Sequence, residues 1–197
     1  GRGASGAVVH GDDLVWSKGF GVRKQGSESP VDPETRMMIG SITKSMTSML
    51  MAKAVDSGKF EWSTNATEVL PKFRLKTEER TRKIQMQHLV CACTGVPRHD
   101  FPLIFEFTDI SAEETIQSLA TIDYFTGFEE AFQYSNQMVA AAGYGVAASF
   151  GTPWGQLHRG YTEAMTRHVF EPIGMTRTTV DFDEAVEDSN RASPHRL

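Results

Sequence analysis

The apolar positions at the start of the chain fall in two short runs of the kind found in β-strands. Residues 7–10 and 14–21 are short runs rich in valine and aromatic side chains, and Gly11-Asp12-Asp13 between them is a turn sequence. Together they predict an antiparallel hairpin. Residues 22–35 are polar and include two prolines, which favours a loop after the hairpin.

Further along the chain, the apolar positions follow helical spacing. Residues 41–57 are apolar around most of the helix circumference, which predicts a core helix, and a glycine follows to end it. Residues 111–119 begin with a Ser-Ala-Glu-Glu capping box and predict a second helix. Residues 138–148 predict a buried helix built from small side chains, and residues 157–170 predict an amphipathic helix.

These elements suggest one domain of the mixed α/β (α+β) class that spans residues 1–197. Residues 1–35 would supply the hairpin and a loop of a sheet region, residues 36–180 a mostly helical region, and residues 181–197 an irregular polar tail. A length of 197 residues suits one domain or part of one. Hydrophobic residues make up 40% and charged residues 23%, which permits a sizeable core.

Charge, apolar run length and cysteine content narrow the class of protein. The net charge of −5 and the lack of a basic block argue against nucleic acid as a partner. The longest apolar run, residues 138–150, is too short to span a bilayer, and no signal peptide is visible. Cys91 and Cys93 are the two cysteines, and because residues this close rarely pair, we predict no disulfide.

A serine and a lysine three residues apart open the predicted core helix. Ser41 and Lys44 would share one face of that helix, so their side chains can touch. A serine hydroxyl is a poor nucleophile at neutral pH, and a neighbouring lysine can serve as a proton acceptor or as a fixed positive charge. Gly40 allows close backbone approach at this turn. The S-x-x-K pattern by itself also fits an ordinary helix start with an exposed lysine.

The tripeptide Tyr134-Ser135-Asn136 directly precedes the predicted helix of small residues. A tyrosine near a lysine can act as a phenolate base, because the adjacent positive charge lowers the pKa of the phenol. An asparagine carries both a donor and an acceptor, which suits it to bind a substrate amide or to hold the lysine. The alternative is a core tyrosine beside a helix cap made by Ser135 or Asn136.

Taken in order, these motifs resemble the penicillin-recognising serine hydrolases, which include class C β-lactamases, D,D-peptidases, D-aminopeptidases and related esterases. The Ser41-x-x-Lys44 and Tyr134-Ser135-Asn136 motifs carry the resemblance. Further matching segments are spread over nearly the whole chain: Trp16 to Gly21, His88 to Pro97, Phe132 to Asn136 and Phe170 to Thr176. The chain departs from the pattern of this family at Phe128-Glu129, where members of the family often carry Pro-Gly.

The resemblance implies an acyl-enzyme mechanism within a β-lactamase/transpeptidase-like fold. Ser41 would attack a carbonyl, Lys44 and Tyr134 would share the proton transfers, and Asn136 would orient the substrate amide. The N–H of Ser41 would be one oxyanion donor, a group often worth about 3 kcal/mol. Gly40 would belong to the substrate-binding residues. The implied substrate is a β-lactam, a peptide or an ester, and the implied location is periplasmic or secreted.

The third motif of the family, K-T-G or H-x-G on a downstream strand, has no clear match. The one H-x-G after Tyr134 is His158-Arg159-Gly160, which comes early and opens a helical pattern. We therefore expect an incomplete domain that lacks the C-terminal strands of the sheet, with open edges that favour self-association or a complementing chain.

The sequence leaves three functions open. The first is a class C-type β-lactamase or penicillin-binding homologue, and the second is a carboxylesterase or D-amino-acid peptidase of the same family. The third is a catalytically silent fragment or scaffold that needs a partner chain. We predict no metal, because no pair of histidines combines with a carboxylate at ligand spacing, and no cofactor.

Overall fold

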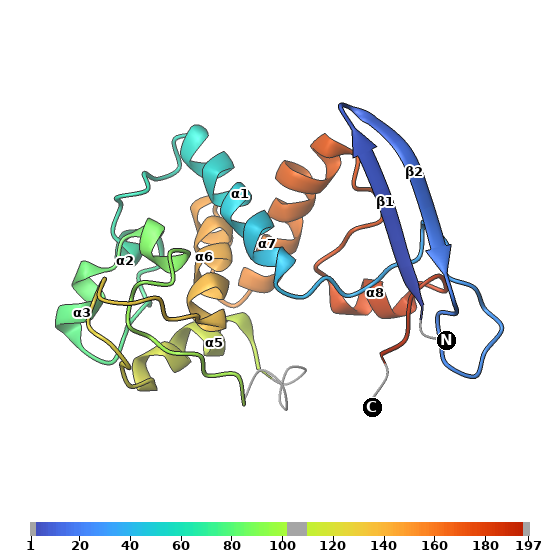
Figure 1. Ribbon diagram of the computed structural model, residues 1–197. Coiled ribbons are helices and arrows are strands. Elements are labelled where there is room, and N and C mark those ends of the chain that lie inside the picture. The colour runs from blue at the N-terminus through green and yellow to red at the C-terminus, as the bar shows by residue number, and fades with distance from the viewer. Residues whose placement is uncertain (1–2, 102–109, 195–197) are drawn as a thin grey trace. The chain divides into compact units, whose positions relative to one another are not determined.

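The computed structural model describes residues 3–101 and 110–194, and the chain divides into two compact units (Figure 1). The strand unit consists of Gly1–Gly40 together with Gly174–Leu197, and the helical unit consists of Ser41–Ile173. The helical unit is shorter at both ends than the predicted region of residues 36–180, because residues 36–40 and 174–180 belong to the strand unit.

The strand unit contains the predicted hairpin. Strand β1 (Ala4–His10) pairs with β2 (Asp13–Phe20) in antiparallel register, with Val8 opposite Trp16 and an irregularity between Val8 and Val9. Gly11 makes the turn at a φ of 63°, a conformation in which glycine carries no steric cost. The apolar side chains of both strands are largely exposed within the described residues.

The prediction of an irregular tail over residues 181–197 is wrong in part. Residues Phe182–Glu187 form helix α8, whose first turn is capped by the Asp181 carboxylate accepting from the Glu184 N–H at 3.0 Å. An ion pair of 2.9 Å joins Glu184 to Arg36. The cap stabilises the helix because it satisfies a terminal N–H group. The polar composition of the segment had favoured an irregular structure instead. Residues 195–197 lie outside the described residues.

The helical unit is built from short and long helices joined by loops. Among the described residues, its helical elements are α1 (Ile42–Asp56), α2 (Ala66–Val69), α3 (Glu78–Lys83), η1 (Met86–Leu89), α5 (Ala112–Ser118), η2 (Leu119–Thr121), α6 (Asn136–Ser149), α7 (Leu157–Met165), the π-helical turn η3 (Thr166–Phe170) and η4 (Glu171–Ile173). The predicted capping box of α5 is present, because Ser111 and Glu114 each bond to the other's backbone N–H.

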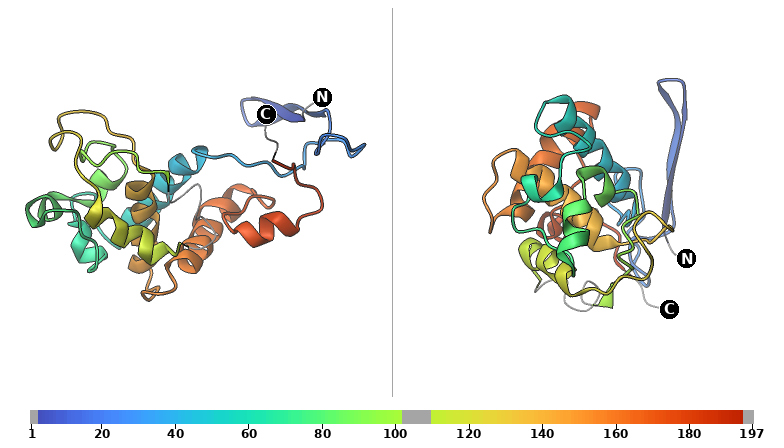
Figure 2. Two further views of the ribbon diagram at one scale, coloured as in Figure 1. Left: turned by 90° about the horizontal axis from the view of Figure 1, so that it is seen from below. Right: turned by 90° about the vertical axis from the view of Figure 1, so that its left-hand side faces the viewer.

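Three helices pack together and fix the positions of the residues at their ends. Helices α1, α6 and α7 lie side by side (Figures 1 and 2). A Cβ atom on Gly143 of α6 would lie 2.6 Å from the Tyr161 ring of α7, so the close approach of these two helices requires glycine. The Tyr161 hydroxyl lies 2.9 Å from the Thr47 hydroxyl of α1. These contacts connect the helix that begins after Ser41 to the helix that begins at Asn136.

Helix α1 is less buried than its sequence predicted. Leu50 and Met51 are fully buried, whereas Ile42 is 59% exposed and Met49 is 49% exposed. The helix therefore packs one face against the core and leaves apolar side chains on the other. No helix within residues 3–101 and 110–194 is long and apolar enough to cross a membrane.

Candidate active site

The Ser41 hydroxyl lies at the N-terminus of α1 and contacts two side chains. Its Oγ is 2.6 Å from the Tyr134 Oη, and Lys44 Nζ donates a hydrogen bond to the same Oγ at 3.2 Å. Lys44 is one helical turn along from Ser41, so the spacing of three residues brings the two groups to one face. The Ser41 side chain is exposed, which leaves its oxygen accessible to a substrate.

The Tyr134 phenol lies close to two cations. Lys44 Nζ is 4.7 Å from the centroid of the Tyr134 ring, and the Arg98 guanidinium carbon is 5.5 Å from it. The pKa of the Tyr134 phenol is lowered, first by the Lys44 ammonium and then by the hydrogen bond with Ser41, against the opposing effect of burial. A lowered pKa makes the phenolate more accessible near neutral pH, which suits a proton acceptor.

Asn136 is the first residue of α6 and completes the group. Lys44 Nζ donates to the Asn136 Oδ1 at 2.6 Å, and Asn136 Nδ2 donates to an Asp100 oxygen at 2.6 Å. Ser135 occupies the N-cap position of α6, but its side chain makes no capping hydrogen bond. The Asn136 side chain therefore binds Lys44, and the structure does not support the alternative of a side-chain cap at this helix.

A cavity of about 220 Å³ adjoins these groups. Lys44 and Ser48 of α1 line one part of its wall, and Ala92, Gln133 and Tyr134 line another. Since a water molecule takes up about 30 Å³ of liquid, the cavity has room for several waters or for a small substituent beside Lys44 and Tyr134.

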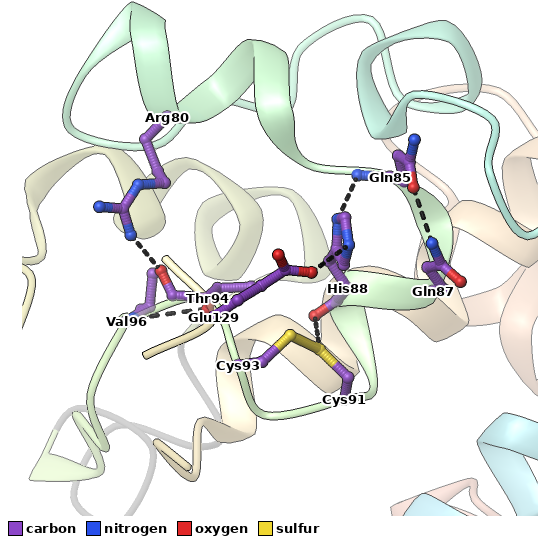
Figure 3. Close-up of a disulfide and its surroundings, with 9 residues drawn as sticks. All are labelled: Arg80, Gln85, Gln87, His88, Cys91, Cys93, Thr94, Val96 and Glu129. Carbon is purple, nitrogen blue, oxygen red and sulfur yellow. Dashed lines mark hydrogen bonds and ion pairs between the residues drawn. A yellow bond between two sulfur atoms is a disulfide. The ribbon is translucent and has the colours of Figure 1, made fainter. Parts of the chain in front are cut away.

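The segment that leads into Tyr134 is held by backbone hydrogen bonds to the loop around the two cysteines. Figure 3 shows that loop together with Glu129. The Gln133 N–H donates to the Ala92 carbonyl at 2.6 Å, and the Glu129 N–H donates to the Cys93 carbonyl at 2.8 Å. Glu129 has a φ of 61°, the left-handed region that favours glycine. The loop therefore fixes the backbone on which Tyr134 depends.

Contrary to the prediction, Cys91 and Cys93 form a disulfide (Figure 3). Ala92 between them has a φ of 56°, which turns the backbone back on itself. Their Cα atoms are consequently 5.4 Å apart, inside the range that a disulfide requires. The sequence separation of two residues did not reveal this turn, because a left-handed alanine cannot be foreseen from composition.

Replacing both cysteines with serine is expected to reduce the free energy of unfolding by about 1–2 kcal/mol, because the loop closed by this disulfide is very short. The midpoint of thermal unfolding should fall by roughly 2–8 °C in a calorimetric scan. A dithiol reductant serves as the matched control: it should lower the midpoint of the wild-type protein and leave the double variant unchanged. Equal midpoints for oxidised and reduced wild-type protein would contradict the prediction.

Two residues beside the site were missed by the sequence reasoning. Asp100 accepts from Asn136 and pairs through its other oxygen with Arg98. Both follow the Thr94-Gly95-Val96-Pro97 turn, whose resemblance to a family segment was the available signal. Charged residues after such a turn carry no spacing pattern of their own, so they could not be assigned from the sequence.

Two further predicted features have definite positions. Gly40, directly before Ser41, has a φ of 53°, a conformation that glycine adopts readily. His158-Arg159-Gly160 lies in the first turns of α7, which confirms that this H-x-G is helical and is not on a strand. A Cβ atom on Gly160 would clash with the Thr152 side chain, so this glycine allows α7 to pack against the loop that precedes it.

Comparison with known proteins places these motifs in a family. A family model described as Beta-lactamase matches residues 1–196. An unguisins hydrolase from Aspergillus campestris is 28% identical over 190 residues, which are 93% of this chain and 34% of the relative. A β-lactamase from Pseudomonas fluorescens is 26% identical over 84% of this chain and 42% of its own length.

A solved structure shares the fold. The octameric penicillin-binding protein homologue from Pyrococcus abyssi matches with a TM-score of 0.81 and 25% identity, over 97% of this chain and 43% of that one. The chain spans about a third of the length of the first curated relatives it matches. The family model covers nearly every residue, and the fold agrees with it. The chain therefore belongs to the β-lactamase family.

Proposed function

We propose that this protein is a serine acyl-hydrolase that acts through an acyl-enzyme on β-lactams or related amides. Ser41 is the nucleophile, Lys44 and Tyr134 handle the proton, and Asn136 with Gly40 belongs to the substrate-binding residues. The observation that carries the proposal is the contact of one serine oxygen with a phenol and an amine, at 2.6 Å from the Tyr134 Oη and 3.2 Å from the Lys44 Nζ.

The geometry supports a sequence of proton transfers. The Ser41 Oγ attacks the substrate carbonyl carbon while its proton passes to the Tyr134 oxygen, and the Lys44 ammonium stabilises the phenolate that accepts it. The Ser41 N–H, at the positive end of α1, is one donor to the developing oxyanion. The proton returns to the leaving group, and water then hydrolyses the acyl-serine ester.

The relatives support the hydrolase class more strongly than any one substrate. The Aspergillus campestris relative is named for hydrolysis of unguisins, and the Pseudomonas fluorescens relative is named as a β-lactamase. Both names describe hydrolysis, whereas the identities of 28% and 26% leave the substrate to experiment. An ester or a peptide substrate is accordingly the second candidate within the same mechanism.

Covalent labelling tests the proposal. The protein is incubated separately with a fluorescent penicillin, an aryl ester and a D-alanyl peptide, and the intact mass is measured after each incubation. We expect a mass increase equal to the acyl group, located by peptide mapping on the segment that contains Ser41. Turnover of a chromogenic cephalosporin compared with that of the aryl ester then ranks the substrates.

Two controls make the result decisive. Ser45, one turn further along α1, bonds to the Ile42 carbonyl, so the Ser45→Ala variant should still be labelled. The Ser41→Ala variant should not be labelled by any reagent. If the wild-type protein forms no adduct with any of the three reagents, the proposal fails, and the silent scaffold that needs a partner chain becomes the better account.

A further inference from the structure

The side-chain amide of Asn136 lies between a cation and an anion. Its oxygen accepts from Lys44 Nζ at 2.6 Å, and its nitrogen donates to Asp100 Oδ1 at 2.6 Å. An ammonium group offers donors alone, and an ionised carboxylate offers acceptors alone. A rotation of the amide by half a turn would therefore place donor against donor and acceptor against acceptor, so one orientation satisfies both neighbours.

Asp100 is kept ionised and in place. Its side chain is 13% exposed, and the second carboxylate oxygen forms an ion pair with the Arg98 Nε. Burial raises the pKa of Asp100, but the hydrogen bonds from Arg98 and Asn136 outweigh it and leave the pKa below its usual value. The carboxylate therefore remains an acceptor at physiological pH, which is the condition that fixes the amide.

The short loop that carries Asp100 is attached to the start of α6. Gln137 is 2% exposed, and its Nε2 donates a hydrogen bond to the His99 carbonyl. Consecutive side chains of α6, Asn136 and Gln137, thus bind consecutive residues of the loop. This attachment gives Asp100 a defined position relative to the groups around Ser41.

We propose that Asp100 is a positioning residue that holds the Asn136 amide with its oxygen facing Lys44, while Arg98 holds the Asp100 carboxylate. This inference rests on the proposed function, since it assigns a role beside the same nucleophile. With the amide fixed, the Lys44 ammonium has a constant acceptor at 2.6 Å and stays within reach of Ser41 Oγ. Without Asp100, the amide can rotate and present its NH₂ group to the ammonium, which displaces the lysine.

Two substitutions at one position separate this role from simple packing. Asp100→Asn keeps the shape of the side chain and removes the obligate acceptor, whereas Asp100→Glu keeps the acceptor and changes the shape. We expect Asp100→Asn to slow acylation of Ser41 by about 10- to 100-fold, the loss typical of a hydrogen bond to a charged group. Asp100→Glu should be the faster of the two variants. A packing role predicts the reverse order.

Asp123→Asn is the matched control, because Asp123 also forms an ion pair with a basic side chain, that of Lys76, and is 83% exposed. Its loss removes the same charge and should leave the acylation rate unchanged. A wild-type rate for Asp100→Asn would overturn the proposal.

A spectroscopic signature makes the proposal independent of catalysis. The two side-chain amide protons of Asn136 are identified in ¹⁵N-labelled protein by their loss in Asn136→Ala. We expect one of them to be shifted downfield and protected from exchange in the wild type and in Asp100→Glu, and to return to ordinary values in Asp100→Asn. Unchanged resonances in Asp100→Asn would overturn the proposal even if the rate falls. If the wild-type protein is never acylated, the proposed function fails, and these resonances alone decide the role of Asp100.

Discussion

Substitution of Lys44 with methionine is expected to slow acylation of Ser41 by about 10²- to 10⁴-fold, the range typical of a lost proton-transfer group. Methionine keeps an unbranched side chain of similar length and removes the charge. The lysine Nζ bonds to the Ser41 Oγ at 3.2 Å and to the Asn136 Oδ1 at 2.6 Å, so both contacts are lost together. The measurement is the single-turnover rate of adduct formation with whichever reagent labels the wild-type protein.

Lys53→Met provides the control on the same helix. Lys53 lies in the last turn of α1, and its side chain is exposed, far along the helix from Ser41. Its loss removes the same charge and should reduce the free energy of unfolding by only about 0.3–1 kcal/mol through the helix dipole. If Lys44→Met and Lys53→Met are acylated at equal rates, Lys44 has no role in acylation and is an ordinary residue at a helix start.

The elements that the sequence predicted best are those with a strong periodic signal or an explicit cap. The hairpin, α1, α5 and α6 all lie where two short apolar runs around a turn, helical spacing or a capping box indicated them. Helix α3 lies in a charged stretch without an apolar stripe, and its support is a side-chain cap by Thr77 together with ion pairs four residues apart. Such local polar support is easily overlooked when apolar spacing is the main criterion.

The candidate site shows where sequence reasoning stops. Spacing alone predicted the Ser41–Lys44 contact, because it lies within one turn of one helix. That Tyr134 and Asn136 would meet this pair depended on resemblance, since 93 residues separate Ser41 from Tyr134. Asp100 and the disulfide escaped prediction because each depends on a loop conformation. In the disulfide loop that conformation is a left-handed alanine, which no short motif encodes.

Substitution of Tyr134 with phenylalanine is expected to slow acylation by about 10²- to 10⁴-fold while keeping the ring in place. The hydroxyl that is lost lies 2.6 Å from the Ser41 Oγ, and no other phenol is near that oxygen among the described contacts. Tyr124→Phe is the matched control, because the Tyr124 hydroxyl bonds to Thr77 in a different part of the helical unit. Equal acylation rates for the two variants would show that the Tyr134 hydroxyl does not accept the Ser41 proton.

The pH dependence of acylation should identify Tyr134 as the proton acceptor. Because Lys44 and Ser41 lower the pKa of this phenol from its usual value of 10.0, more of it is phenolate at a given pH, and the rate should rise with pH through that lowered pKa. The rise should be absent in Tyr134→Phe. In Lys44→Met this rise should move to higher pH, since the largest cause of the lowered pKa is gone.

Phenolate absorbance, with Tyr134→Phe as the blank, gives the same pKa without any substrate. Burial raises the pKa of Tyr144 to about 12, so its titration lies well above the range of interest. A rate profile that keeps its rise in Tyr134→Phe would assign the proton to another group.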